Sequence, residues 1–200
     1  MQYFNTLPKI IKTDASGTSV LLTNLLARSS IIPSLLQNSA LYYKYDIQEG
    51  DTPESIAYKY YGESYRYWIV LFANQIIDPQ WQWPMNYLVF QTYLNDKYPL
   101  TDIYGTVYEY QQITTTIDSI TDAVTIETIT IDQSTYTSFM PSTNSFTFPN
   151  GSSVTVTTST KALSIYEYEL NANESNRKIN LFNKRYVEEI ENEFESLMKS

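Results

Sequence analysis

The fold is decided by residues 43–84, which read YKYDIQEGDTPESIAYKYYGESYRYWIVLFANQIIDPQWQWP. At the start of this segment, Tyr43, Tyr45 and Ile47 alternate with polar residues. A period of two is typical of a half-buried strand. Gly50-Asp51 then supplies the residue types of a tight turn. The segment therefore predicts a short strand that ends in a turn.

Helix signals follow the turn directly. Thr52 can accept the free N–H groups of a helix as its N-cap, and Pro53 suits the first helical position. Gly62 can take the left-handed conformation that closes a helix. Ser64 is expected to cap a second helix, which cannot continue past Asp78-Pro79. The order predicted is strand, turn, helix and helix.

Residues 45–62 resemble the signature of LysM modules, which bind N-acetylglucosamine polymers. The resemblance is carried by Gly50-Asp51-Thr52, Ser55-Ile56-Ala57 and Tyr61-Gly62. It implies that Gly50, Asp51, Thr52 and Pro53 would line a sugar groove, together with the segment around Asn74 to Pro79. The same four residues also have a structural role as turn and helix cap, and we favour that role because a fold alone does not confer function.

The continuation of the segment differs from LysM modules and is similar to the LysM-like baseplate wedge protein of T-even-type contractile-tailed phages. The residues that carry this similarity are Tyr67–Asn74, Ile76–Pro79 and Trp83-Pro84, with further support from Leu22–Arg28, Pro53-Glu54 and Glu193–Met198. The similarity covers about residues 20 to 98 and 165 to 200.

Membership of that family implies a structural subunit of the virion tail baseplate, made in the cytoplasm of the host bacterium. Its partners would be other wedge subunits and the proteins of the central hub or tail tube. It would join neighbouring wedges and the hub through protein–protein contacts. Copies would be arranged six-fold by the assembly and not by self-association. The alternative is a peptidoglycan-binding module of a tail- or wall-associated protein.

Composition excludes several classes of function. The 200 residues are 42% hydrophobic, enough for a core, and carry a formal charge of −9, which argues against nucleic-acid binding. The chain has no cysteine and no histidine, so Ser-His and Cys-His nucleophile pairs and the usual zinc sites are impossible. No acidic pair stands in a catalytic motif. We expect no enzymatic activity, no cofactor and no catalytic or metal-binding residue.

Targeting signals are also missing from the sequence. No N-terminal segment has the basic head, apolar run and cleavage site of a signal peptide. The longest apolar region, Val20 to Leu36, is interrupted by Asn24, Arg28 and Pro33 and is shorter than the ~20 residues that span a bilayer. We therefore expect no membrane association.

The N-terminal residues 1–41 predict an arm with a short helix that carries Leu21, Leu22, Leu25 and Leu26. This helix packs on the module or docks on another subunit, and the sequence does not decide between the two. In the docking case, Leu22, Leu25 and Leu26 are interface candidates. Trp81 and Trp83 are further candidates, because tryptophans between two prolines are hard to bury and often anchor interfaces.

Residues 42–110 are assigned to the LysM-like module, with a helix inserted after Pro84 and a strand at 103–110 that would complete its sheet. Residues 111–165 are assigned to a Thr/Ser-rich β insertion. Most of it falls in the stretch 98–160, which has no lysine or arginine. Pro149-Asn150-Gly151, flanked by alternating apolar residues, predicts a hairpin. The apolar residues of 124–131 change parity, so a bulge near Glu127 is expected if all face one core.

Residues 166–200 predict a C-terminal amphipathic helix of about 27 residues and 40 Å, beginning near Asn173. Its apolar stripe supplies the last interface candidates: Phe182, Tyr186, Ile190, Phe194 and Leu197. Five glutamates between Glu188 and Glu195 predict a solvated face. The whole chain is predicted to be α+β: a small LysM-like βααβ module with a helical or extended N-terminal arm, an inserted all-β hairpin region and a long C-terminal helix.

Overall fold

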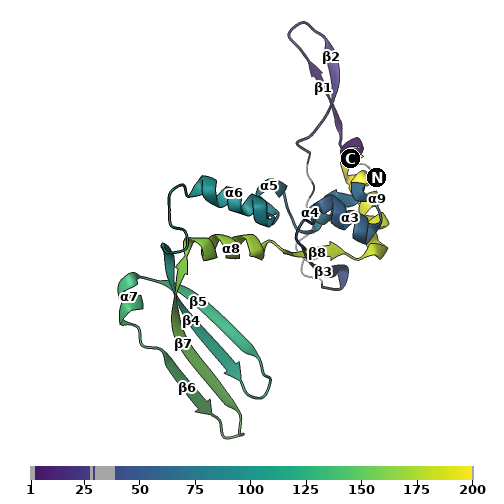
Figure 1. Ribbon diagram of the computed structural model, residues 1–200. Helices are drawn as coiled ribbons and strands as arrows, with labels where there is room; N and C mark the ends of the chain where they lie inside the picture. Colours follow the sequence, from purple (N-terminus) through teal and green to yellow (C-terminus); the bar gives the residue numbers. More distant parts are fainter. Residues whose placement is uncertain (1–2, 28, 30–38, 200) are drawn as a thin grey trace. The chain divides into compact units, whose positions relative to one another are not determined.

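The computed structural model describes residues 3–27, 29 and 39–199 (Figure 1). The chain divides into two compact units. The first is formed by Met1–Val89 with Asn173–Ser200, and the second by Phe90–Ala172. The mixture of helices and strands confirms the α+β prediction.

The first unit contains two short antiparallel strand pairs and several helices. In chain order its elements are α1 (Tyr3–Thr6), β1 (Lys9–Thr13), β2 (Ser19–Thr23), η1 (Ser39–Leu41), β3 (Tyr42–Asp46), α3 (Pro53–Tyr61), η2 (Ser64–Arg66), α4 (Tyr67–Ala73), α5 (Pro79–Gln82), β8 (Lys178–Phe182), η3 (Lys184–Tyr186) and α9 (Val187–Lys199).

Helix α3 has the ends that the sequence predicts. The Thr52 side chain accepts a hydrogen bond from the Ser55 N–H at 3.2 Å, and the Ser55 hydroxyl accepts one from the Thr52 N–H at 2.9 Å. Pro53 occupies the first turn, and Gly62 closes the helix with a left-handed φ of 82°. This reciprocal cap satisfies two of the free N–H groups at the start of the helix.

The second helix is shorter than predicted and begins differently. Glu63, and not Ser64, precedes its first turn, which is the 3-10 turn η2, and α4 ends at Ala73. Gln75 adopts a left-handed φ of 56°, and the Ile76 N–H returns to the Leu71 carbonyl at 3.0 Å. This C-cap, with a left-handed residue and a hydrogen bond back to the last turn, ends the helix before Asp78-Pro79.

The partner of β3 differs from the one predicted. Strand β8, not residues 103–110, pairs antiparallel with β3, and Tyr45 lies opposite Ile179. Residues 107–118 belong instead to strand β4 (Val107–Asp118) of the second unit. In β8, Ile179 and Leu181 lie on the same face and are both buried, and Phe182 at the end of the strand is buried as well.

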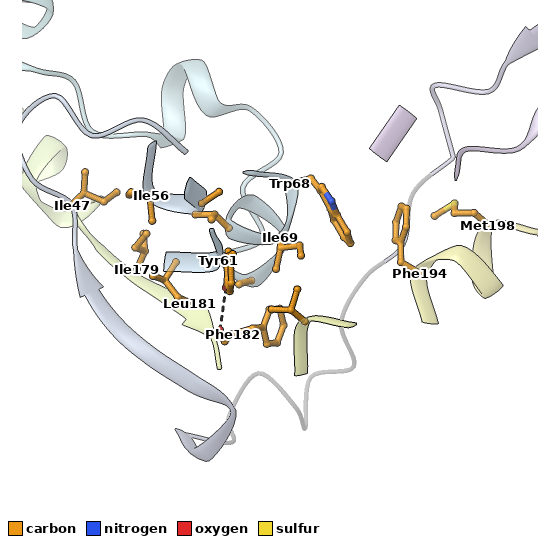
Figure 2. Packing of buried hydrophobic residues seen from close by; sticks show 14 of the residues in the cluster. Ile47, Ile56, Tyr61, Trp68, Ile69, Ile179, Leu181, Phe182, Phe194 and Met198 are labelled. Carbon is orange, nitrogen blue, oxygen red and sulfur yellow. Dashed lines mark hydrogen bonds between the residues drawn. The ribbon is translucent and has the colours of Figure 1, made fainter. Parts of the chain in front are cut away.

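The core of the first unit is formed where α3, α4 and α9 meet the β3–β8 pair (Figure 2). Trp68 packs against Phe194 with a ring centroid distance of 4.8 Å, and Tyr3 of α1 stacks on Phe194 at 5.3 Å. The buried Tyr61 hydroxyl donates to the Phe182 carbonyl at 3.1 Å. Strand β8 and helix α9 therefore complete a core that the segment 43–84 begins.

The N-terminal arm is a hairpin, so the predicted helix over Leu21–Leu26 is wrong. Strands β1 and β2 pair antiparallel, with Ile11 opposite Leu21. The Asp14 carboxylate accepts bonds from the Ser16 and Thr18 N–H groups, both at 2.9 Å, and organises the turn. β-branched residues in both strands favour this extended conformation over a helix.

The second unit contains a four-stranded antiparallel sheet with the order β5-β4-β7-β6 (Figure 1). Its elements are α6 (Tyr87–Lys97), β4 (Val107–Asp118), β5 (Val124–Ile131), α7 (Gln133–Ser138), β6 (Ser142–Thr147), β7 (Ser153–Ser164) and α8 (Ile165–Ser175). The first three residues of α6 and the last three residues of α8 belong to the first unit.

The hairpin predicted around Pro149-Asn150-Gly151 is confirmed, with Phe146 opposite Val154. Two details differ from the sequence prediction. Helix α7 interrupts the region predicted to be all β, and Asp132 caps it by accepting from the Thr135 N–H. Strand β5 has no bulge, because its register with β4 runs without a shift from Val124 to Ile131. Its apolar residues therefore lie on both faces of the sheet.

The C-terminal amphipathic helix is present but begins later than predicted. It is α9, with 13 residues, and its buried residues include Val187, Phe194 and Met198. At 1.5 Å per residue, this length corresponds to about 20 Å. The residues between Asn173 and α9 form the end of α8, strand β8 and the turn η3.

Candidate functional site

The four residues of the predicted groove form the wall of a real hollow in the first unit. Gly50, Asp51, Thr52 and Pro53 line a space of about 250 Å³, and Trp83 contributes to the same wall. Gly50 has a left-handed φ of 81°, which allows the sharp turn after β3. The structure therefore brings the predicted turn and one of the predicted interface tryptophans to a single place.

The Asp51 carboxylate is buried and has three hydrogen-bond donors. It accepts from the Tyr45 hydroxyl at 2.8 Å, the Gln48 N–H at 3.0 Å and the Lys59 ammonium at 2.5 Å. Burial acts to raise the pKa of Asp51, but the bonds from Lys59, Tyr45 and Gln48 outweigh burial and hold that pKa below its usual value. Burial, with the Asp51 bond, raises the pKa of Tyr45 to about 12. Asp51 is thus a fixed structural anion.

The backbone of the turn is also engaged internally. The Trp83 indole N–H donates to the Asp51 carbonyl at 3.0 Å, so this carbonyl already has a hydrogen-bond partner within the unit. Glu49 accepts from the Tyr87 N–H at 2.7 Å and from Arg177 at 3.2 Å. These contacts tie the segment after α5 to the turn, and they are the contacts expected of a structural element.

Acid titration tests the role of Asp51. Its folded pKa is lowered, so its contribution to stability is complete above the unfolded pKa of about 3.9 and is lost as the pH falls through the folded pKa. We expect Asp51→Asn to be less stable than wild type at pH 7, and this difference to shrink as the pH falls toward 2. Urea unfolding at both pH values measures this, and Glu188→Gln on the exposed part of α9 is the control. An equal difference at both pH values would contradict the assignment.

The predicted interface residues fall into three groups by exposure. Five of them are exposed: Trp81 is 59%, Leu25 65%, Leu26 86%, Leu197 52% and Leu22 40% exposed. Three are half-buried: Trp83, Tyr186 and Ile190, of which Trp83 and Ile190 pack against the core. Phe182 and Phe194 are buried at 6% and 3%, so they stabilise the unit itself and are not available to a partner. Phe182 ends strand β8 and Phe194 lies in α9, and both pack in the core.

The acidic face of α9 is only partly solvated. Glu191 is buried and forms a two-pronged ion pair with Arg66, with N–O distances of 3.1 and 3.2 Å. Arg66 also donates to the Tyr61 carbonyl at 3.2 Å. The prediction of a solvated face holds for the exposed Glu188, Glu189 and Glu193 and is wrong for Glu191. This pair ties α9 to η2.

Sequence reasoning missed two further polar anchors. The Asn74 side chain donates to the Val70 and Asn180 carbonyls and accepts from the Asn180 N–H, each at 2.8 Å, so it joins α4 to β8. In the second unit, the buried Glu169 carboxylate accepts from Tyr93, Lys97 and Tyr98. Burial acts to raise the pKa of Glu169, and the three donors outweigh this effect and lower it. No local motif marks either residue.

Among residues 3–27, 29 and 39–199, no cluster of three or more acidic side chains could hold a metal ion. Over the same residues, each helix is too short or too polar to cross a bilayer. The polar groups that the structure does bring together hold helices and strands in place.

Comparison with known families gives the class of protein. A family model matches residues 30–199, most of the chain, and it describes wedge proteins of the phage baseplate. The chain belongs to the family Base plate wedge protein 53. No curated protein matches the chain. The match begins after the β1–β2 hairpin, and it confirms the predicted baseplate wedge family, whereas the likeness to LysM modules stays a prediction.

Membership of this family supports a structural role in the baseplate of the virion tail. It implies interaction with other components of the baseplate and a location in the tail.

Proposed function

We propose that this protein joins neighbouring wedges to each other and to the central hub through protein–protein contacts, without catalytic activity. The observation that carries the proposal is the exposed apolar arm, formed by the β1–β2 hairpin and the turn after it. Ile11 is 73% and Leu21 64% exposed, and Leu26 is 86% exposed. Exposed apolar groups of this extent are typical of interaction sites.

The arm has little to stabilise it alone. An isolated two-stranded hairpin is marginally stable in water. The β1–β2 pair forms its own two-stranded sheet, and its residues are exposed from Lys9 to Leu22 within the described chain. Ile10 and Leu22 face one side while Ile11 and Leu21 face the other, so both sides are apolar. Docking on another subunit would bury both sides.

The partners we propose are other wedge subunits and proteins of the hub or tail tube. Six-fold placement would follow from the assembly, since a small arm alone gives little area for stable self-association. The net charge of −9 supports a role without nucleic-acid binding. The absence of cysteine suits synthesis in a reducing host cytoplasm before assembly into the tail.

Co-expression with other baseplate subunits tests the proposal. We expect stable complexes in size-exclusion chromatography and weak self-association of the chain alone. Ile11→Ser or Leu26→Ser should weaken the complex by about tenfold or more, as loss of an interface anchor does. Ile77→Ser is the matched control, because Ile77 is 69% exposed outside the arm. Failure to form a complex with any baseplate subunit would contradict the proposal.

Binding to purified peptidoglycan tests the alternative function. We expect none, because the Asp51 carboxylate and carbonyl already accept hydrogen bonds from within the unit. Trp83→Phe removes the indole donor to the Asp51 carbonyl and keeps an aromatic ring. Binding of peptidoglycan by this variant would show that the indole bond blocks the hollow. No binding would show that the hollow has no affinity for the polymer. Saturable binding by wild type that is lost on substitution of Asp51 or Thr52 would show that scaffolding is not the complete function.

A further inference from the structure

The two outer strands of the four-stranded sheet differ in how they are protected from pairing. Strand β6 has six residues, is rich in serine, threonine and asparagine, and lies between Pro141 and Pro149. Strand β5 has eight residues, VTIETITI, with one charge and no proline, glycine or lysine. Proteins usually protect an outer strand with short length, charged side chains (lysine above all), proline or a bulge. Of these features, strand β5 has only the single charge of Glu127.

The open edge of β5 is also apolar on both faces. Val124 and Ile126 lie on one face, at 57% and 64% exposure, and Ile129 lies on the other at 56%. Among the described residues, β5 pairs only with β4. A strand added beside β5 would satisfy its outward N–H and C=O groups and cover apolar side chains on both faces. The parity change in the sequence therefore fits a strand that is enclosed only in an assembly.

The charge around this edge is entirely negative. Glu127 lies at the middle of β5, Asp122 precedes it and Asp132 follows it. The stretch 98–160 contains six acidic residues and no lysine or arginine. An added strand that carried acidic residues would be repelled, whereas lysine or arginine opposite Glu127 would form a favourable cross-strand pair.

We infer that β5 accepts, as a fifth strand of the sheet, an extended segment of another baseplate subunit that carries lysine or arginine between β-branched or aromatic residues. This inference deepens the proposed function, on which the identity of the partner as a baseplate subunit rests. It names one contact surface and the chemistry of its partner. Main-chain hydrogen bonds would supply affinity, and the side chains on alternate faces would supply specificity.

A second copy of this chain is a poorer occupant of the edge. Two β5 strands that paired with each other would bring two sets of Glu127, Asp122 and Asp132 together. Like charges placed opposite each other on neighbouring strands are destabilising. The surface is therefore better suited to a cationic segment of a different protein.

Binding of synthetic peptides to the full-length protein tests the inference. The probe is an eight-residue peptide of alternating valine and threonine with two central lysines. Its controls are the same peptide with glutamates in place of the lysines, and the lysine peptide with a central proline. Amide NMR shifts of the labelled protein locate the binding. We expect shifts in β5, with the lysine peptide bound about fivefold or more tightly than the glutamate peptide.

Charge reversal on each outer strand makes the test specific. Glu127→Lys should remove the preference for the lysine peptide and favour the glutamate peptide, whereas Ser145→Lys on β6 should leave binding unchanged. Circular dichroism checks that both variants fold. The inference is overturned if the lysine peptide does not bind at about 1 mM, or if the amide shifts fall outside β5. It is also overturned if the proline peptide binds as tightly as the lysine peptide, or if the wild-type protein forms dimers that Glu127→Lys dissociates. Complex formation with whole subunits is measured separately, so the proposed function can stand if this contact fails.

Discussion

Replacing Leu181 with alanine is expected to lower the free energy of unfolding of the first unit by about 2–5 kcal/mol. Leu181 is fully buried at 0% exposure, on the strand that completes the β3–β8 pair. The substitution removes apolar contacts and leaves a cavity that the strand and helices cannot fully close. All three tryptophans of the chain, Trp68, Trp81 and Trp83, belong to the first unit. Tryptophan fluorescence during urea unfolding therefore reports on this unit alone.

Leu26→Ala is the matched control for this experiment, since Leu26 is 86% exposed. A surface substitution of this kind should change the free energy of unfolding by no more than about 0.5 kcal/mol. A change of less than about 1 kcal/mol for Leu181→Ala would contradict the burial of β8. The comparison also separates folding from assembly, because Leu26 belongs to the proposed docking arm and Leu181 does not.

Local signals in the sequence predicted the elements that depend on neighbouring residues. Helix α3 is the clearest example, because Thr52, Pro53 and Gly62 act on the backbone within a few residues of their own positions. The hairpin at Pro149-Asn150-Gly151 is another, since its turn and flanking strands are adjacent in the chain. Both could be read without knowing the rest of the fold.

Strand β8 could not be predicted in the same way. Ile179, Phe182, Tyr186 and Ile190 are spaced by three and four residues, which is also the spacing of a helix. The chain becomes a strand at Lys178–Phe182 because β3, more than 130 residues earlier, offers an edge to pair with. Tertiary pairing overrides a weak local preference there, and the same effect moved the predicted partner strand into the other unit.

The candidate site shows the same division. The turn at Gly50–Pro53 was predicted from adjacent residues, but the hydrogen bond from Trp83 to the Asp51 carbonyl joins residues 32 positions apart. The donors to Glu169 lie 71 to 76 positions away. A single sequence shows that such side chains are polar or aromatic and does not show which group they meet.

Replacing Glu191 with alanine is expected to cost about 3–5 kcal/mol, the range measured when one partner of a buried ion pair is removed. The side chains of Arg66 and Glu191 are only 20% and 11% exposed, and two N–O contacts join them. The substitution leaves the Arg66 guanidinium without its carboxylate in a place that water reaches poorly. Helix α9 then loses a polar attachment to η2.

The matched control is an ion pair on the exposed part of the same helix. Lys199 and Glu195 are 69% and 41% exposed and lie four residues apart. Pairs of this kind contribute no more than about 0.5 kcal/mol, so Glu195→Ala should have little effect. Urea unfolding followed by tryptophan fluorescence measures both variants under the same conditions.

A double-mutant cycle separates the attraction between the two groups from the cost of leaving one of them alone. Arg66→Met with Glu191→Met removes both charges and keeps apolar volume, and such replacements are often neutral or stabilising. We expect the double variant to be more stable than Glu191→Met alone, with a coupling free energy of about 1–3 kcal/mol. If the two single effects simply add, the pair does not hold α9, and the helix is attached chiefly through its apolar residues, among them Val187, Phe194 and Met198.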